Sequence, residues 1–273
     1  MEQTIQNVLT VDGASWVTVD VYGEPGTPGL LMVPGVMSDA RSWSEVAAVI
    51  DAWPSVMVLN RRGRAPSGPL TPEYSVDTEV ADLLAVLDRF GPVEALFGWS
   101  YGGLIALLAA DRSTVKQVIA YEPVGRPFAL DALGALHAAE AAEDWDRSVE
   151  IVNRRISGFS AEYVDELRAD PGVWGMLRRF SEPLHAELAA LNAIAPPEAM
   201  AQRPARVDLI LGQRNRNAEP YGTAFEAIEG RVPGAVVHEL AGQGHLAHLE
   251  DPAGLGRLIN ELALERQSTS GDR

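Results

Sequence analysis

The feature that most constrains this fold is a series of short apolar runs that alternate with segments of helical periodicity. Two of the runs, 29–35 and 55–63, are continuous and end in turn residues, as strands that are buried on both faces do. Further strand candidates lie at 93–99, 115–122, 206–212 and 235–240. Apolar residues at helical spacing lie between or after the runs, at 43–50, 78–90, 101–110, 221–229 and 252–264. The alternation predicts an α/β fold whose mostly parallel sheet has helices on both faces.

Two regions depart from this alternation. Near the N-terminus, alternating apolar segments on either side of Asp12 and Gly13 predict an antiparallel hairpin. Between the fourth and fifth runs, residues 126–200 contain several short helical patterns and no strand pattern. We therefore expect a core made of residues 1–125 and 201–273, with 126–200 inserted as a helical cap over the carboxyl edge of the sheet.

The charge balance limits the partners of this chain. It has 22 basic and 38 acidic residues and a formal net charge of -16, so phosphate backbones and anionic membrane surfaces repel it. We expect neither a nucleic acid nor a membrane as partner, and a homodimer is left open. The N-terminus shows no leader pattern, and no apolar run reaches the roughly 20 residues that span a bilayer, which predicts a cytoplasmic protein. The absence of cysteine excludes disulfides and thiolate catalysis.

Residues 98–102, Gly-Trp-Ser-Tyr-Gly, match the pattern G-x-S-x-G. The pattern alone is weak, because a small residue at the start of a buried helix gives the same letters. Its context is more informative, since a strand enters the motif and an apolar helix leaves it. In that setting the serine hydroxyl projects above the sheet, and the next N–H points toward a developing oxyanion. We predict that Ser100 is the nucleophile and that the Tyr101 N–H is an oxyanion donor.

A serine nucleophile needs a base, and the base needs a third group that orients it. Of the five histidines, His137 and His185 lie in the helical insertion and His238 lies within a strand. His245 and His248 follow the last strand, at the sheet edge where catalytic groups are usually presented. We predict that His245 is the base. The H-x-x-H pair has no third ligand at a matching position, so we expect no metal and a packing role for His248.

These segments together resemble the α/β-hydrolase superfamily. "LLMVPGVMSDARSW" is similar to its oxyanion loop, "LNRRGRAPSG" to its strand-end turn, "GWSYGG" to its nucleophile elbow and "GQGHLAHLEDP" to its histidine loop. The resemblance covers nearly the whole chain and implies the α/β-hydrolase fold and a reaction without a cofactor. It also implies that the N–H of Val36 is the second oxyanion donor. The loop begins Pro34-Gly35, where the family usually has His-Gly.

The resemblance leaves two positions for the acid of the triad. Most relatives have an aspartate three positions after a glycine at the end of the penultimate strand, and this chain has Asn215 after Gly212. Asparagine orients an imidazole but does not stabilise its charge. Some members of the superfamily, including lactonases that open zearalenone, place a glutamate where Glu122 ends the strand after the elbow helix. An unpaired carboxylate is costly to bury there. We predict the triad Ser100, Glu122 and His245, with Asn215 as the alternative to Glu122.

The resemblance implies a serine hydrolase that cleaves a carboxylic ester or lactone through an acyl-enzyme. The apolar insertion and the negative charge predict a neutral or apolar small-molecule substrate. Three enzymes with the same serine remain alternatives, namely a carbon–carbon hydrolase, a thioesterase and a perhydrolase, and so does a non-hydrolytic binding or biosynthetic protein. Trp174 lies beside glycines and is predicted to face the cleft and bind substrate. The run of arginines at 61–64 suggests either an anion site or the scaffold of its own turn.

Overall fold

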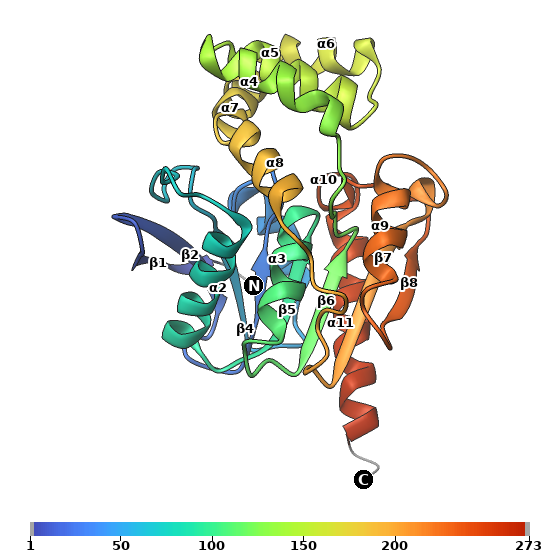
Figure 1. Ribbon diagram of the computed structural model, residues 1–273. Helices are drawn as coiled ribbons and strands as arrows, with labels where there is room; N and C mark the ends of the chain where they lie inside the picture. The colour runs from blue at the N-terminus through green and yellow to red at the C-terminus, as the bar shows by residue number, and fades with distance from the viewer. Residues whose placement is uncertain (1–2, 271–273) are drawn as a thin grey trace.

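The structure is a computed structural model that describes the backbone of residues 3–270 and the side chains of residues 5–263. Its centre is an eight-stranded sheet in the order β1-β2-β4-β3-β5-β6-β7-β8 (Figure 1). The strands are β1 (Gln3–Val11), β2 (Ser15–Gly23), β3 (Gly29–Val33), β4 (Ser55–Asn60), β5 (Val93–Trp99), β6 (Gln117–Tyr121), β7 (Arg206–Gly212) and β8 (Val236–Leu240). The pairs β1/β2 and β2/β4 are antiparallel, and the pairs from β4/β3 to β7/β8 are parallel. The predicted hairpin and mostly parallel sheet are confirmed.

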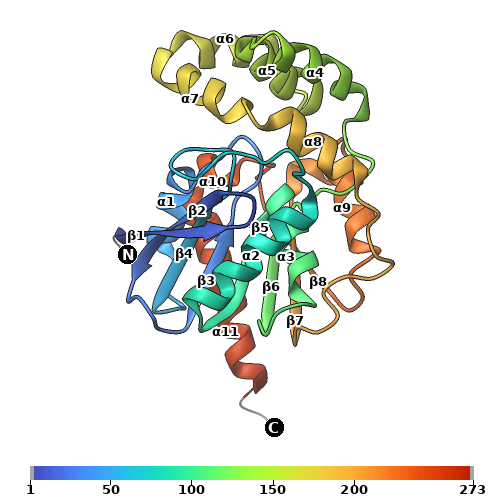
Figure 2. The same cartoon turned by 60° about the vertical axis from the view of Figure 1, so that its left-hand side comes forward.

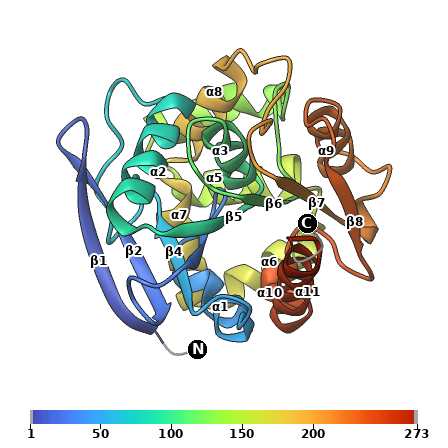
Figure 3. The same ribbon diagram turned by 90° about the horizontal axis from the view of Figure 1, so that it is seen from below.

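Helices cover both faces of the sheet, as the sequence predicts. They are α1 (Ser44–Val49), α2 (Val76–Phe90), α3 (Tyr101–Ala110), α9 (Tyr221–Glu229), α10 (Ala247–Glu250) and α11 (Pro252–Ser270). Helices α2, α3 and α9 lie on one face, and α1 and α11 lie on the other (Figure 3). Each face therefore has its own apolar core, with Leu104 and Phe225 buried in one and Val46 and Ile259 in the other. No helix among the described residues combines the length and the apolarity that crossing a bilayer requires.

Helix α2 shows how local chemistry sets the boundaries of an element. The Ser75 hydroxyl accepts a hydrogen bond from the Thr78 N–H, and the Thr78 hydroxyl accepts one from the Ser75 N–H, which forms a capping box. The helix therefore begins at Val76, two residues before the start that apolar spacing predicts. Its Val80 and Leu83 are buried and pack in the same core as α3.

Between β6 and β7 the chain leaves the sheet and forms the helices of the cap, which lie within residues 133–193. These are α4 (Leu133–Ala141), α5 (Trp145–Glu150), α6 (Ala161–Ala169), α7 (Pro171–Ser181) and α8 (Leu184–Ala193), with the π-helical segment η3 (Ile151–Ile156) after α5. Short 3-10 turns lie at η1 (Arg41–Trp43), η2 (Leu130–Ala132) and η4 (Gln213–Asn215). The described segment between β6 and β7 contains no strand. The cap forms a separate layer above the carboxyl ends of the parallel strands (Figures 1 and 2).

Candidate active site

Ser100 occupies a strained turn between β5 and α3. Its backbone angles are φ 55° and ψ -122°, a conformation that residues other than glycine rarely adopt and that clusters at functional sites. The Ser100 N–H donates to the carbonyl of Tyr121 at 3.0 Å, which ties the turn to the neighbouring strand. A Cβ atom on Gly102 would overlap the carbonyl oxygen of Val33. The glycine is therefore required where α3 passes this close to β3, as the elbow motif implies.

His245 and Glu122 form a buried pair beside this turn. The Nδ1 atom of His245 lies 2.6 Å from the Oε2 atom of Glu122, and Glu122 is fully buried. Two hydrogen bonds to backbone carbonyls fix the loop that carries His245. Trp99 donates to the carbonyl of His245 at 2.9 Å, and the Tyr121 hydroxyl donates to the carbonyl of Gly244. A carboxylate on Nδ1 leaves Nε2 as the nitrogen that can accept a proton.

Asn215 contacts the carboxylate. Its Nδ2 atom lies 2.9 Å from both oxygens of Glu122, and the Gly212 N–H donates to Oε1 at 2.8 Å. A Cβ atom on Gly212 would approach that oxygen to 2.8 Å, so glycine allows the close approach. Of the two candidates that the sequence left open, Glu122 is the one that contacts His245. Asn215 instead donates to the carboxylate of Glu122 and so helps to fix its position.

Tyr221, at the start of α9, was not identified from the sequence. Its ring lies parallel to the imidazole of His245, with the centroids 3.6 Å apart and the planes 11° apart. The Tyr221 hydroxyl lies 2.9 Å from the Ser157 hydroxyl, just after η3. Burial is the main cause that raises the pKa of Tyr221 above its usual value. The ring shields one face of the imidazole from water, and its π face attracts an imidazolium. No local pattern marks this residue, because stacking is a contact between distant segments.

His248 packs in an aromatic cluster next to the site. Its ring is stacked on Trp43 at 4.5 Å and tilted against Trp99 at 4.4 Å. Burial, followed by the proximity of His245, lowers the pKa of His248 to about 3. The imidazole is therefore neutral at neutral pH. These contacts agree with the packing role that the sequence predicts.

The predicted oxyanion donors belong to two segments that lie next to Ser100. Tyr101 is the first residue of α3, where backbone N–H groups are free to bind an anion. Val36 follows Gly35 in the loop after β3 and lines the same cavity as Ser100 and His245. A Cβ atom on Gly35 would lie 2.8 Å from that of Ser100, so the loop passes directly beside the proposed nucleophile.

The cavity above Ser100 has a volume of about 170 Å³ and lies between the sheet edge and the cap. Its wall is largely apolar and includes Met37, Phe128, Val152, Ile156 and Leu188. The segment η3 contributes to this wall, and π-helical turns occur often at functional sites. The shape and lining are those of a pocket for a small molecule that buries mostly apolar surface.

Trp174 packs inside the cap. Its Nε1 donates to a carboxylate oxygen of Asp146, and the guanidinium of Arg168 lies 4.5 Å from its ring centroid. Among the described residues, the cavity lining includes Val173 and Met176 but not Trp174. The i, i+3 pair of Val173 and Met176 occupies one face of α7, and Trp174 lies one helical step of about 100° away. The position predicted for Trp174 at the cleft therefore differs from the one it occupies.

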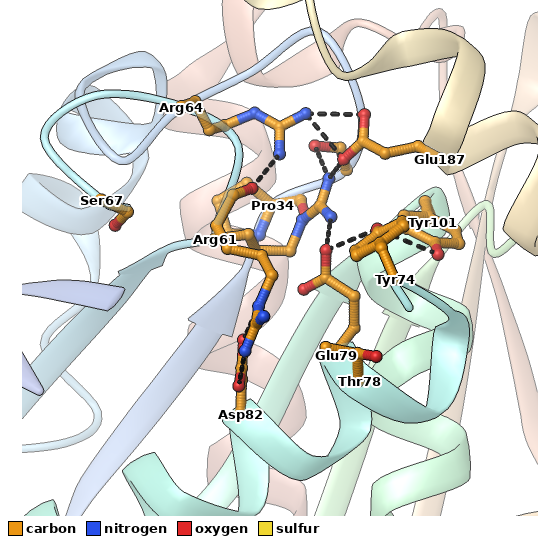
Figure 4. A network of polar contacts seen from close by, with 12 residues as sticks. Pro34, Arg61, Arg64, Ser67, Tyr74, Thr78, Glu79, Asp82, Tyr101 and Glu187 are labelled. Carbon is orange, nitrogen blue, oxygen red and sulfur yellow. Dashed lines mark hydrogen bonds and ion pairs between the residues drawn. The ribbon is translucent and has the colours of Figure 1, made fainter. Parts of the chain in front are cut away.

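The arginines at 61–64 form a buried ionic network beside the cavity (Figure 4). Arg62 makes two bonds of 2.6 Å to Asp82, and Arg64 makes two of 2.8 Å to Glu187 on α8. Arg61 contacts both Glu79 and Glu187. Each guanidinium thus has a carboxylate partner, which agrees with the scaffold interpretation of this run. The signal in the sequence is that several arginines end a buried strand, because buried charges need partners.

One group of three metal-ligand side chains occurs among the described residues, and it lies in the cap. His137 and Glu140 on α4 and His185 on α8 have donor atoms within 4.8 Å of one another. None of the three lines the cavity. A metal there would lie outside the candidate active site.

A sequence model of the alpha/beta hydrolase family matches residues 30–257. The chain belongs to this family. The match runs from β3 into α11 and so includes the elbow, the cap and the histidine loop. The family and fold that the sequence predicts are confirmed.

Two curated proteins are similar in sequence. The chain is 26% identical over 257 residues to a 2-succinyl-6-hydroxy-2,4-cyclohexadiene-1-carboxylate synthase from Enterobacter sp. (strain 638), with 88% of this chain and 93% of the relative covered. It is 26% identical over 176 residues to a 2-heptyl-3-hydroxy-4(1H)-quinolone dioxygenase from Mycobacteroides abscessus, with 61% of this chain and 64% of the relative covered. The second match thus spans less than two thirds of that relative.

Solved structures share the fold over almost their whole length. An alpha/beta hydrolase from Sphaerobacter thermophilus superimposes with a TM-score of 0.76 at 21% identity, covering 93% of this chain and 99% of the other. An enol-lactonase from Burkholderia xenovorans gives a TM-score of 0.71 at 18% identity, covering 93% and 98%. At these identities the similarity establishes the fold alone.

Proposed function

We propose that this protein is a serine hydrolase that cleaves a neutral or apolar carboxylic ester or lactone through an acyl-enzyme. One observation carries the proposal. Ser100 on its strained turn and the imidazole of His245, which a fully buried carboxylate orients, line the same apolar cavity. We also propose that residues 1–125 and 201–273 form the core and that residues 126–200 form the inserted cap.

In the proposed reaction, Nε2 of His245 removes the Ser100 hydroxyl proton while Oγ attacks the substrate carbonyl carbon. The N–H groups of Val36 and Tyr101 stabilise the oxyanion of the tetrahedral intermediate, and Glu122 stabilises the imidazolium. The C–O bond breaks as the imidazolium gives its proton to the leaving alkoxide, which leaves an acyl group on Ser100. Water deprotonated by His245 then attacks this ester, and the carboxylic acid leaves as Ser100 recovers the proton.

The charges at the cavity support a neutral substrate. Glu187 is a fully buried carboxylate in the cavity wall, but Arg61 and Arg64 pair with it. A paired carboxylate offers little attraction to a cation, and the remaining wall is largely apolar. We therefore expect neutral esters to be turned over better than cationic esters of the same size. Faster turnover of the cationic esters would contradict the substrate class.

A non-hydrolytic reaction is the second candidate, because two relatives are named as a synthase and a dioxygenase.

Three other enzymes, a carbon–carbon hydrolase, a thioesterase and a perhydrolase, would use the same serine and base as the proposed hydrolase. The carbon–carbon hydrolase and the thioesterase differ from the ester or lactone hydrolase in the bond that breaks as Ser100 is acylated. The perhydrolase differs in the second step, where hydrogen peroxide replaces water as the nucleophile that releases the acyl group. Thioester and carbon–carbon substrates matched to the ester panel separate the first two by relative kcat/KM.

The first experiment is to react the protein with a fluorophosphonate probe and to assay p-nitrophenyl esters and aromatic lactones. We expect rapid labelling of Ser100 and measurable turnover, because an adjacent base activates the serine. Ser100→Ala is the matched control, and it should lose both labelling and turnover. A protein that is neither labelled nor active on the panel would contradict the hydrolase proposal and favour the non-hydrolytic candidate.

A further inference from the structure

The loop that carries the proposed oxyanion donor Val36 is bound by a buried guanidinium that the reaction does not itself require. Arg61 is 1% exposed. Its Nε donates to the carbonyl of Pro34 at 2.9 Å, and its Nη2 donates to the carbonyl of Gly35 at 2.9 Å (Figure 4). Pro34 is the residue at which the loop departs from the usual His-Gly start. A side chain from the turn that follows β4 thus fixes two successive peptide groups of this loop.

The contact with Gly35 determines which way the Val36 N–H points. In a trans peptide group the C=O and N–H bonds point in opposite directions. Since the Gly35 carbonyl faces Arg61, the N–H of Val36 faces away from Arg61. Gly35 lies against Ser100, and Val36 lines the cavity. Arg61 thereby holds the peptide plane in the orientation that an oxyanion donor needs.

The same network reaches the second proposed donor. Glu79 accepts a bond of 2.6 Å from Arg61 and one of 2.7 Å from the Tyr74 hydroxyl. That hydroxyl lies 3.3 Å from the Tyr101 hydroxyl, and the guanidinium of Arg61 lies 5.0 Å from the Tyr101 ring centroid. One connected group of side chains therefore contacts both Gly35 of the oxyanion loop and Tyr101.

The network also connects the loop to the cap. Glu187 on α8 lies 2.7 Å from Nη2 of Arg61 and 2.8 Å from Nη2 of Arg64. Burial lowers the pKa of Arg61, but Glu79 and Glu187 outweigh it and keep this pKa above its usual value. The guanidinium therefore keeps its charge at every pH at which the protein is folded. Because Glu187 also lines the cavity, a displacement of α8 acts directly on the side chain that holds the oxyanion loop.

We propose that Arg61 is a positioning residue that fixes the oxyanion loop and that Glu187 couples this loop to cap helix α8. This role rests on the proposed hydrolase function. A lysine at position 61 would keep the charge but lose the planar fork that binds two carbonyls and two carboxylates at once. The loop would then be free to turn the Val36 N–H away from the oxyanion.

The test compares Arg61→Lys with Arg62→Lys, a matched change at the next residue. Arg62 is equally buried, but its two short bonds go to Asp82 and not to the oxyanion loop. We expect kcat per fluorophosphonate-titrated site to fall about 100-fold in Arg61→Lys, with KM within about 3-fold, as when an oxyanion donor is lost. In Arg62→Lys we expect kcat per site within about 3-fold of wild type. The affinity for phenylboronic acid, which forms a tetrahedral adduct on the serine, should fall in parallel with kcat.

Each outcome of this test decides a point. If wild type is active and Arg61→Lys keeps its kcat per site, the positioning role is overturned while the hydrolase proposal stands. If wild type turns over no ester or lactone, both are overturned. If Arg61→Lys does not fold, Glu187→Gln replaces it, and we expect a loss in kcat of about 10-fold from the weakened coupling. An unchanged kcat in that variant overturns the role.

A separate observation in the cap carries a second inference. His137 and Glu140 are three residues apart on α4 and therefore share a face, and His185 of α8 lies against them. The Nδ1 atom of His185 is 2.6 Å from Oε2 of Glu140, and the two imidazole centroids are 5.0 Å apart. All three donor atoms lie within 4.8 Å of one another.

The geometry points to a site for a divalent transition-metal ion, of which Zn²⁺ is the type, joining α4 to α8. Two imidazoles and one carboxylate are a common set of three protein ligands for zinc, with water as the fourth ligand. Zinc–ligand distances of about 2.0–2.2 Å place tetrahedral donor atoms about 3.3–3.6 Å apart. The wider donor pairs, up to 4.8 Å apart, therefore have to move closer, and His185 Nδ1 and Glu140 Oε2, 2.6 Å apart, have to separate slightly. His137 is exposed, so its side chain is free to rotate inward. The net charge of -16 favours cation binding in general.

Calorimetric titration of metal-stripped protein with Zn²⁺ tests this site, with Mg²⁺ as a cation that prefers oxygen ligands. We expect one Zn²⁺ per chain with micromolar or tighter affinity at pH 7.5, weaker binding at pH 5.5 because protons compete with the metal for its ligands, and little Mg²⁺ binding. Binding should be lost in His137→Ala and in His185→Ala. It should persist in His238→Ala, which removes the separate histidine–carboxylate pair with Asp208. Absence of Zn²⁺ binding, or binding that survives His137→Ala and His185→Ala as an adventitious ion only, overturns the site.

Discussion

Two fully buried glutamates near the cavity, Glu122 and Glu187, have different kinds of charged partner. Glu122, which follows β6, pairs with His245 and accepts further bonds from Gly212 and Asn215. Glu187 on α8 pairs with Arg61 and Arg64. A guanidinium stays protonated at any pH that the fold survives, whereas an imidazole takes and releases protons near neutrality. The comparison teaches that the partner decides whether a buried carboxylate supports a group that can exchange protons or only holds structure together.

The two glutamates also belong to different layers. Glu122 comes from a strand end of the sheet, where the segments that follow β5, β6 and β8 bring the predicted catalytic residues together. Glu187 comes from the cap and reaches down to the arginines of the β4 turn (Figure 4). The histidine side of the cavity therefore carries the proposed chemistry. The arginine side holds the loop and the cap in place.

The largest expected difference between the two sides comes from Glu122→Gln. It keeps the size of the side chain but removes the charge that stabilises the imidazolium, and we expect kcat on a p-nitrophenyl ester to fall about 10⁴-fold. Glu187→Gln is the matched control on the other side, with the loss of about 10-fold given above. Activity that survives Glu122→Gln would return the orienting role to Asn215.

Tyr221→Leu removes the aromatic face from His245. We expect kcat/KM to fall on the order of 10-fold, because an imidazolium loses a cation–π contact of about 1–2 kcal/mol. Tyr221→Phe keeps the ring and loses only the contact with Ser157, so its kcat/KM should stay within about 3-fold of wild type. Equal losses in the two variants would show that the hydroxyl, and not the ring, matters.

Asn215→Asp places a second carboxylate next to Glu122, where the amide now donates to both oxygens. Like charges at this distance raise the pKa of one member of the pair. We expect kcat/KM at pH 7 to fall about 5-fold and the acid limb of its pH profile to move to higher pH. Asn215→Ala removes the amide donor without adding charge. It should leave the acid limb of the pH profile closer to its wild-type position. Higher activity in Asn215→Asp would assign the acid to position 215 instead.

The smallest expected effect concerns stability near His248. Its folded-state pKa of about 3 lies below its unfolded value, so the unfolded chain binds more protons as the pH falls through about 6.5. This residue should therefore lower the free energy of unfolding by about 1–2 kcal/mol between pH 7.5 and pH 5.0. Urea denaturation at the two pH values measures the change. His248→Phe keeps an aromatic ring against Trp43 and should reduce the dependence on pH, and an unchanged dependence would argue against a buried neutral imidazole.

Local sequence determined the elements and the residues that the fold brings to the cavity. Apolar runs and helical spacing located the parallel strands and the helices on both faces, because burial on a sheet or a helix leaves a periodic pattern. The elbow glycines singled out Ser100, since few sequences allow a strand and a helix to approach so closely. The cost of burying a lone carboxylate directed attention to Glu122 and a histidine partner.

Only the tertiary structure decided which side chains meet across these elements. Helical spacing indicates that one face of α7 is buried, but it does not say whether Trp174 or Val173 faces the cavity. The stack of Tyr221 on His245, the bonds from Asn215 to Glu122 and the bonds from Arg61 to the oxyanion loop join segments far apart in the chain. The sequence thus determined which elements form and which residue types end them. The contacts between those ends depend on how the sheet, the loops and the cap pack in three dimensions, because periodicity and motifs carry information only about neighbours along the chain.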